Sequence, residues 1–154
     1  MKTTRRTARE LALNILYQVD ASGVPFDEAL ATALEFVEVS GRATDGAQVK
    51  EYAAMLVTGV REHRDEIDAF IEQLSEGWTL DRQPAVDRNI LRIALFEIKY
   101  SESAPPIVAV DEAVELAKKY STAESGKFVN GVLAGYLRDH TPEMEETDLG
   151  STDS

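Results

Sequence analysis

The sequence contains no cysteine, which excludes disulfide bonds, thiol catalysis and cysteine-ligated zinc. Its two histidines, His63 and His140, are too few and too far apart in the chain for a histidine metal cluster. No glycine-rich phosphate loop and no nucleophile paired with a base is recognisable, and the acidic clusters at 111–112 and 143–146 are typical of solvated surfaces. We therefore expect no metal, no cofactor and no enzymatic activity.

Long hydrophobic runs are also missing. A membrane-spanning helix needs about 20 continuous apolar residues, and the sequence has no such segment. The first nine residues lead directly into a helical pattern, without the separate apolar core of a secretory signal. These features predict a cytoplasmic protein that does not enter a membrane.

Basic residues are scarce, with 16 Lys and Arg against 28 Asp and Glu and a formal net charge of −12. Such a charge ordinarily argues against nucleic-acid binding, which depends on neutralising phosphates. The charges are unevenly distributed, however, because residues 1–9 contain four basic side chains and no acidic one. Residues 139–154 contain no Lys or Arg and form an acidic tail that we expect to be disordered, with the acids Asp139, Glu143, Glu145, Glu146, Asp148 and Asp153.

The hydrophobic pattern is helical throughout. Apolar residues recur at helical spacing, and glycines and prolines separate the periodic segments. The pattern predicts one all-α domain of about seven helices: 4–21, 26–39, two between 47 and 75 that are joined or kinked near His63, 84–101, 107–120 and 121–139. The helix at 84–101 is apolar on nearly all sides, so we expect it to be the central one. A capping box from Ser121 to Glu124 is expected to open the last helix.

The first helix carries a candidate nucleic-acid face. Arg5, Arg6 and Arg9 fall within an arc of about 100° on an ideal helix, and Tyr17 lies angularly next to Arg6. Guanidinium groups bind phosphates in a bidentate manner, and an aromatic ring stacks on an unpaired base. The alternative is a solvated helix terminus without a ligand.

The last helix carries a second candidate. Lys127 and Phe128 lie off the apolar stripe of that helix, so that a cation and an aromatic ring stand side by side. This combination suits single-stranded RNA.

Four segments in this order resemble the NusB family: RRTARELA at 5–12, DRNILRIALFE at 87–97, VDEAVELAK at 110–118 and KFVNGVL at 127–133. The resemblance covers roughly residues 4–138. It implies an all-α fold of two helical sub-bundles, about 1–62 and 63–138, followed by the tail. It also implies a transcription antitermination factor that binds the boxA element of nascent ribosomal RNA operon transcripts, jointly with the ribosomal protein NusE and within the transcription elongation complex.

The resemblance further assigns residues to the two binding sites. RNA contacts are expected from Arg5, Arg6, Arg9, Tyr17, Lys127 and Phe128. NusE contacts are expected along the loop and helix that contain Trp78, Arg82, Asp87 and Arg88. Two alternatives remain open: an RNA-targeting module like the one found in some RNA cytosine methyltransferases, and a helical self-association module that forms a homodimer.

Overall fold

The computed structural model describes residues 4–39, 43–101 and 104–140. The described chain is helical and contains no strand, which confirms the predicted all-α class. Its elements are α1 (Thr4–Ser22), α2 (Phe26–Val39), α3 (Ala43–Glu62), α4 (Arg64–Leu74), a 3₁₀ turn η1 (Leu80–Arg82), α5 (Ala85–Phe96), a π-helical turn η2 (Glu97–Ser101), α6 (Pro106–Tyr120) and α7 (Ala123–His140). Asp139 and His140, which the sequence assigns to the acidic tail, belong to α7, and the rest of the predicted tail lies outside the described residues.

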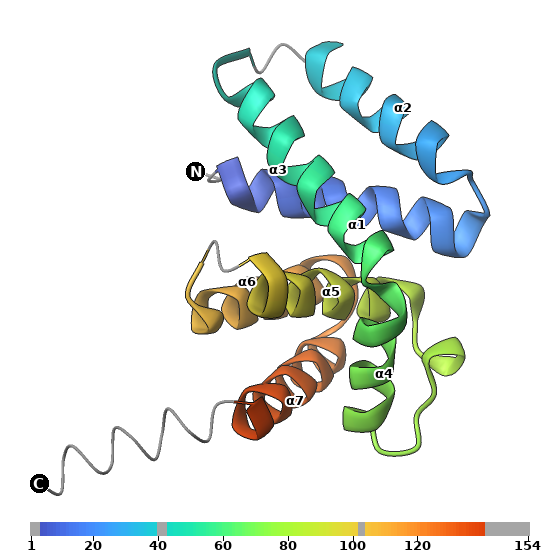
Figure 1. Cartoon of the computed structure of the whole chain (residues 1–154), viewed down its shortest axis with the longest axis vertical. Coiled ribbons are helices and arrows are strands. Elements are labelled where there is room, and N and C mark those ends of the chain that lie inside the picture. Colours follow the sequence, from blue (N-terminus) through green and yellow to red (C-terminus); the bar gives the residue numbers. More distant parts are fainter. Residues whose placement is uncertain (1–3, 40–42, 102–103, 141–154) are drawn as a thin grey trace, which may run out of the picture.

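Figure 1 shows α1, α2 and α3 grouped in one half of the molecule and α4 to α7 in the other. The predicted break between the third and fourth helices falls at His63. Helix α5 lies between the groups and packs against α1 and α3 as well as against α4, α6 and α7. Its residues 90–96 are all buried, and its apolar side chains belong to one hydrophobic cluster that continues into both groups. The prediction that this helix is central is therefore confirmed.

The predicted helix at 84–101 changes its winding near its end. The α-helical part stops at Phe96, and Glu97–Ser101 form a π-helical turn. Single π-helical turns are often found at functional sites. Here the turn contains Glu97, whose side chain is almost fully buried and faces α1.

The start of α7 differs from the prediction by one residue. The Thr122 hydroxyl, rather than that of Ser121, accepts the hydrogen bond from the backbone amide of Ser125, at 3.0 Å. Ser121 instead ends α6, where its amide donates to the carbonyl of Ala117 at 2.8 Å. The predicted capping box is thus wrong, because Ser121 is the C-cap of α6 and Thr122, an equally suitable cap, serves the start of α7.

A glycine inside α3 permits the close contact between α3 and α5. A Cβ atom at Gly59 would overlap the Phe96 ring. Only a residue without a side chain fits here, so Gly59 fixes how near the two helices approach.

Candidate nucleic-acid interface

The exposed start of α1 lies beside α6, where Arg6 and Glu112 form a two-pronged ion pair. The Nε of Arg6 donates to Oε1 of Glu112 at 2.9 Å, and its Nη2 donates to Oε2 at 2.6 Å. The Arg6 side chain is 45% exposed. The hydrogen bond from Arg6 is the main reason why the pKa of Glu112 lies below its usual range. The guanidinium thus faces solvent while a carboxylate holds its orientation.

Arg9 points into the protein instead. Its Nε and Nη2 donate to the two carboxylate oxygens of Glu97, both at 2.8 Å, and the Tyr52 hydroxyl donates to the same carboxylate at 2.5 Å. Burial acts to lower the pKa of Arg9, but the hydrogen bonds and charge of Glu97 outweigh it and raise that pKa. The sequence predicts Arg9 as an RNA contact together with Arg5 and Arg6, yet only 4% of its surface is exposed. The structure places it beneath the face, where it connects α1 to η2.

The other two predicted α1 residues lie on the surface. Arg5 is exposed, and its guanidinium lies 5.1 Å from the centre of the Tyr52 ring. Tyr17 is 40% exposed. Arg5, Arg6 and Tyr17 therefore form the accessible part of the predicted α1 face, which we call the α1 face below.

The predicted α7 residues differ in exposure. Lys127 is exposed, with its ammonium 3.5 Å from the Glu124 carboxylate. Phe128 is half-buried and packs against the hydrophobic cluster. Its ring meets that of Trp78 edge-on, with centroids 4.8 Å apart. Phe128, predicted as an RNA contact, and Trp78, predicted as a partner contact, thus form a single aromatic pair.

The predicted partner residues also divide into exposed and structural ones. Trp78 is 38% exposed and Arg82 is exposed on η1. Asp87 is buried and accepts a hydrogen bond from the Ser125 hydroxyl at 2.9 Å. Arg88 donates to both carboxylate oxygens of Asp20, at 2.6 and 2.8 Å. Asp87 and Arg88 hold α5 to α7 and to α1, and they present little surface to a partner.

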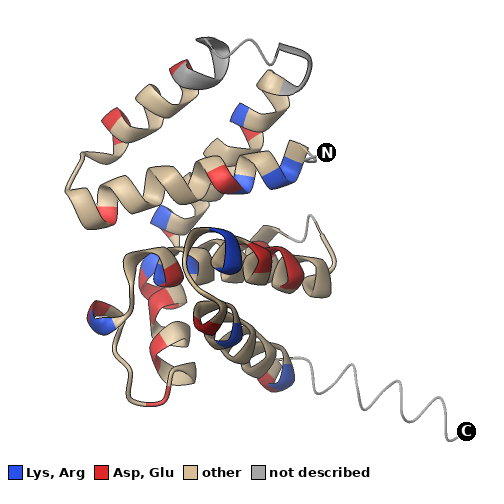
Figure 2. Cartoon of the chain, turned by 180° about the vertical axis from the view of Figure 1, so that it is seen from behind, with Lys and Arg blue, Asp and Glu red and all other residues tan. Residues whose placement is uncertain are grey.

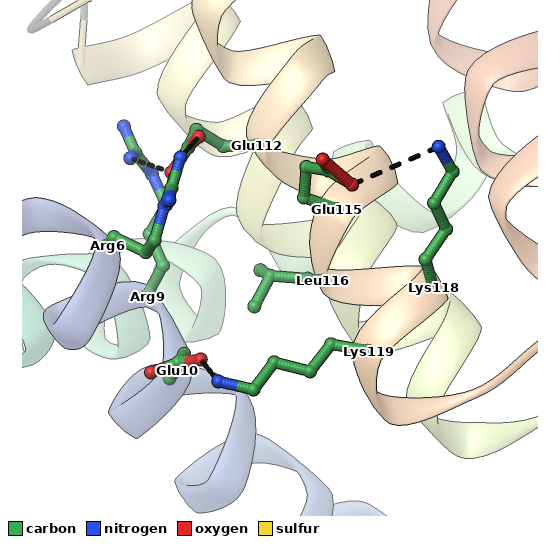
Figure 3. A pocket seen from close by; sticks show the side chains of 8 residues that line it. All are labelled: Arg6, Arg9, Glu10, Glu112, Glu115, Leu116, Lys118 and Lys119. Carbon is green, nitrogen blue, oxygen red and sulfur yellow. Dashed lines mark hydrogen bonds and ion pairs between the residues drawn. The ribbon is translucent and has the colours of Figure 1, made fainter. Parts of the chain in front are cut away.

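A groove of about 380 Å³ runs between α1 and α6. Figure 3 shows the side chains that line it, among them the Arg6–Glu112 and Lys119–Glu10 pairs that join the two helices. Its lining residues are Arg6, Arg9, Glu10, Glu112, Glu115, Leu116, Lys118 and Lys119. Figure 2 shows that basic and acidic segments alternate along α1, α6 and α7. The groove shares Arg6 with the α1 face. Lys118, another lining residue, lies close to Gly126 at the start of α7, so the groove reaches toward α7.

Sequence reasoning missed the carboxylates Glu97 and Glu112, which hold Arg9 and Arg6. The Asp111-Glu112 pair has the pattern of a solvated helix surface, and the sequence alone favours that interpretation. Helical spacing indicates which residues share a face of one helix, but it does not indicate which neighbouring helix that face meets. No local signal distinguishes Glu112 from Glu115, one turn further along α6.

Other classes of site find no support in the described part of the chain. No described helix is long and apolar enough to cross a membrane. Residues 4–39, 43–101 and 104–140 contain no group of acidic and histidine side chains that could hold a metal ion.

Comparison with known proteins gives one consistent result. The family model of NusB matches residues 6–138. The transcription antitermination protein NusB of Symbiobacterium thermophilum is 48% identical over 137 residues, which are 88% of this chain and 90% of that protein. The protein of the same name from Myxococcus xanthus is 46% identical over 84% of this chain and 91% of its own length. Among solved structures, a chain of the crystal structure of antitermination factors NusB and NusE in complex with double-stranded RNA is 34% identical, with 91% of this chain and 100% of that chain covered and a TM-score of 0.77. This protein therefore belongs to the NusB family.

Proposed function

We propose that this protein is a transcription antitermination factor that binds RNA together with the ribosomal protein NusE. The observation that carries the proposal is the α1 face, where two accessible guanidinium groups and an exposed tyrosine lie on one side of a helix that the buried Arg9–Glu97 pair fixes in place. Related proteins are named as antitermination proteins, and a similar chain occurs in a complex with NusE and RNA.

The RNA that we propose is the boxA element of nascent ribosomal RNA operon transcripts. An unpaired strand suits the α1 face because guanidinium groups hold phosphates while Tyr17 offers a ring for stacking. On α7, the exposed Lys127 is our candidate for a phosphate contact, whereas Phe128 is half-buried and its ring meets that of Trp78. We assign the direct contacts to Arg5, Arg6, Tyr17 and Lys127, and a positioning role to Arg9.

The NusE partner is assigned to the surface around Trp78 and Arg82. Both side chains are exposed on the segment between α4 and α5, and Arg88 of α5 holds that segment through hydrogen bonds to its backbone. The backbone carbonyls of Leu80 and Gln83 accept hydrogen bonds from Arg88 at 2.9 and 3.1 Å, which fixes the shape of η1. The protein acts in this proposal without catalysis, in the cytoplasm, as part of the elongation complex. The names of its relatives favour this function over that of an RNA-targeting module of a methyltransferase.

The test is RNA binding with and without NusE. We expect weak binding of a boxA-like single strand by the protein alone, because few phosphate contacts are available on a chain of net charge −12. The three phosphate contacts assigned to Arg5, Arg6 and Lys127 should give a log–log salt slope of about −2 or shallower, since each contributes roughly −0.7 for single strands. Addition of NusE should increase the affinity markedly. Equal affinity with and without NusE, or no preference for a boxA-like strand over a scrambled one, would contradict the proposal.

A further inference from the structure

All four basic residues that line the groove between α1 and α6 are paired with carboxylates of the same chain. Arg6 pairs with Glu112, Arg9 with Glu97 and Glu112, and Lys119 with Glu10 at 2.6 Å. The fourth, Lys118, lies 3.9 Å from Glu115. A phosphate that enters this groove therefore meets cations that already have an anionic partner.

These pairs differ in how readily a phosphate could replace the carboxylate. Arg9 and Glu97 are both nearly inaccessible, so their separation would leave a charge buried without a partner. The Arg6 side chain is 45% exposed and that of Glu112 is 13% exposed, so the arginine side of this pair is open to solvent, unlike the Arg9–Glu97 pair. Arg6 is thus the arginine of the groove that is placed to exchange its partner.

The two-donor geometry that Arg6 shows toward Glu112 would also suit a phosphate. Two parallel N–H donors of one guanidinium hold two oxygens of one anion, and this fork serves carboxylates and phosphates alike. Glu112 also accepts from Nη1 of Arg9 at 3.4 Å, so its carboxylate occupies a position between two guanidinium groups. A phosphate of an RNA strand on the α1 face would find its best-matched donors at this position.

We propose that Glu112 is an internal competitor of RNA, whose carboxylate occupies the phosphate position at Arg6 in the free protein and is displaced when RNA binds. This inference rests on the proposed function and adds a regulatory residue to the same site. Glu112 keeps Arg6 oriented, and it reduces the affinity for RNA by the free energy of the pair that must be exchanged. It also disfavours weak anionic ligands that cannot displace it.

The test compares Glu112→Gln with the matched control Glu115→Gln. Both substitutions remove one negative charge from the groove side of α6, but only the first removes the carboxylate partner of Arg6. We expect the affinity for a boxA-like strand to rise about three- to fivefold for Glu112→Gln, the range that loss of an exposed ion pair allows. For Glu115→Gln we expect less than about a twofold rise, because its side chain is 62% exposed and solvent screens its charge.

A double-substitution cycle makes the test specific for Arg6. In an Arg6→Ala background the gain from Glu112→Gln should fall to that of Glu115→Gln, because the Arg6 guanidinium is absent and Arg9 stays paired with Glu97. Glu112→Asp retains the charge but shortens the side chain, so it should raise the affinity if the pairing matters and leave it unchanged if only the net charge matters. Melting temperatures of all variants verify that each is folded.

Several outcomes would overturn the inference. Equal gains from Glu112→Gln and Glu115→Gln, or an undiminished gain in the Arg6→Ala background, would show that general electrostatics is responsible. A loss of affinity in Glu112→Gln would show that Glu112 only pre-organises Arg6. The proposed function survives each of these results, whereas a wild-type protein that does not bind the RNA even with NusE would overturn the proposed function and the inference together.

Discussion

Arg9 on α1 and Glu97 in η2 form a bidentate ion pair, with both N–O distances 2.8 Å and only 4% and 2% of the two side chains exposed. The Tyr52 hydroxyl of α3 donates to the same carboxylate. One buried carboxylate thus connects α1, α3 and the end of α5. This connection sets the position from which Arg5 and Arg6 project.

Arg9→Ala should destabilise the protein strongly, by about 3–5 kcal/mol, because the substitution leaves the Glu97 carboxylate buried without its cation. Urea unfolding measures the change in the free energy of unfolding. Arg6→Ala is the matched control, since Arg6 lies one turn earlier on α1 in an exposed ion pair, and it should leave the stability nearly unchanged. Equal stability of the Arg9→Ala variant and the wild type would show that the Arg9–Glu97 pair does not hold α1 to η2.

A second buried network predicts a dependence of stability on pH. Burial disfavours the charged form of Asp20, but hydrogen bonds from Arg88 and Asn89 and the charge of Arg92 outweigh it and lower its pKa from 3.8 to about 2. A carboxyl group with a lowered folded-state pKa stabilises the fold above its unfolded pKa, and this contribution is lost as the pH falls.

Stability should therefore decline as the pH drops from about 4 to about 2, and Asp20→Asn should make this decline less steep. Unfolding curves over this range measure the effect. Asp27, whose side chain is 93% exposed, provides the control, because Asp27→Asn should leave the decline as it is. If the free energy of unfolding declined equally with falling pH in the wild type and in the Asp20→Asn variant, this role of Asp20 would be contradicted.

Two glycines in helices should respond to alanine in opposite ways. Gly59→Ala should destabilise the protein by about 1–3 kcal/mol, because the new methyl group overlaps the Phe96 ring in a packed core. Gly131 on α7 is exposed, and a methyl group there would meet no other atom within 4 Å, so Gly131→Ala should stabilise the helix by up to about 1 kcal/mol. Thermal melts of both variants provide the comparison, and a neutral Gly59→Ala would show that α3 and α5 separate easily.

Much of the fold could be predicted from the sequence because helical periodicity is a local property. The residues that make the segment 90–96 of α5 largely apolar are adjacent in the chain, and the central position of α5 follows from them. The break at His63 is predicted in the same way. The choice of Thr122 over Ser121 as the cap, and the π-helical turn after Phe96, depend on contacts with other helices and could not be predicted from local pattern.

The candidate site could be predicted only in part for the same reason. An ideal helix places Arg5, Arg6 and Arg9 on one face, but the burial of Arg9 depends on Glu97, which is 88 residues further along the chain. The Phe128 ring lies off the apolar stripe of α7, yet Trp78 covers it from the segment between α4 and α5. In both cases the decisive partner is distant in sequence.

The burial of Phe128 changes what its substitution should do. An exposed stacking residue would be removed at little cost in stability, whereas Phe128→Ala should cost about 1–3 kcal/mol because the half-buried ring packs against Trp78 and the core. Leu95→Ala, at a position that is 1% exposed, should cost more, about 2–5 kcal/mol. Thermal melts of the two variants measure this order, and a Phe128→Ala variant as stable as the wild type would show that the ring has no structural role.

The salt dependence of RNA binding by Arg6→Ala tests the central claim, that the α1 face contacts the RNA backbone, most directly. With a boxA-like strand and NusE present, we expect weaker binding and a log–log salt slope that is shallower by about 0.7, the value for one lost phosphate contact on a single strand. Arg64→Ala removes the same charge from an exposed position on α4 and should leave the slope unchanged. An Arg6→Ala variant with the wild-type slope and affinity, or an equal effect of Arg64→Ala, would contradict the claim.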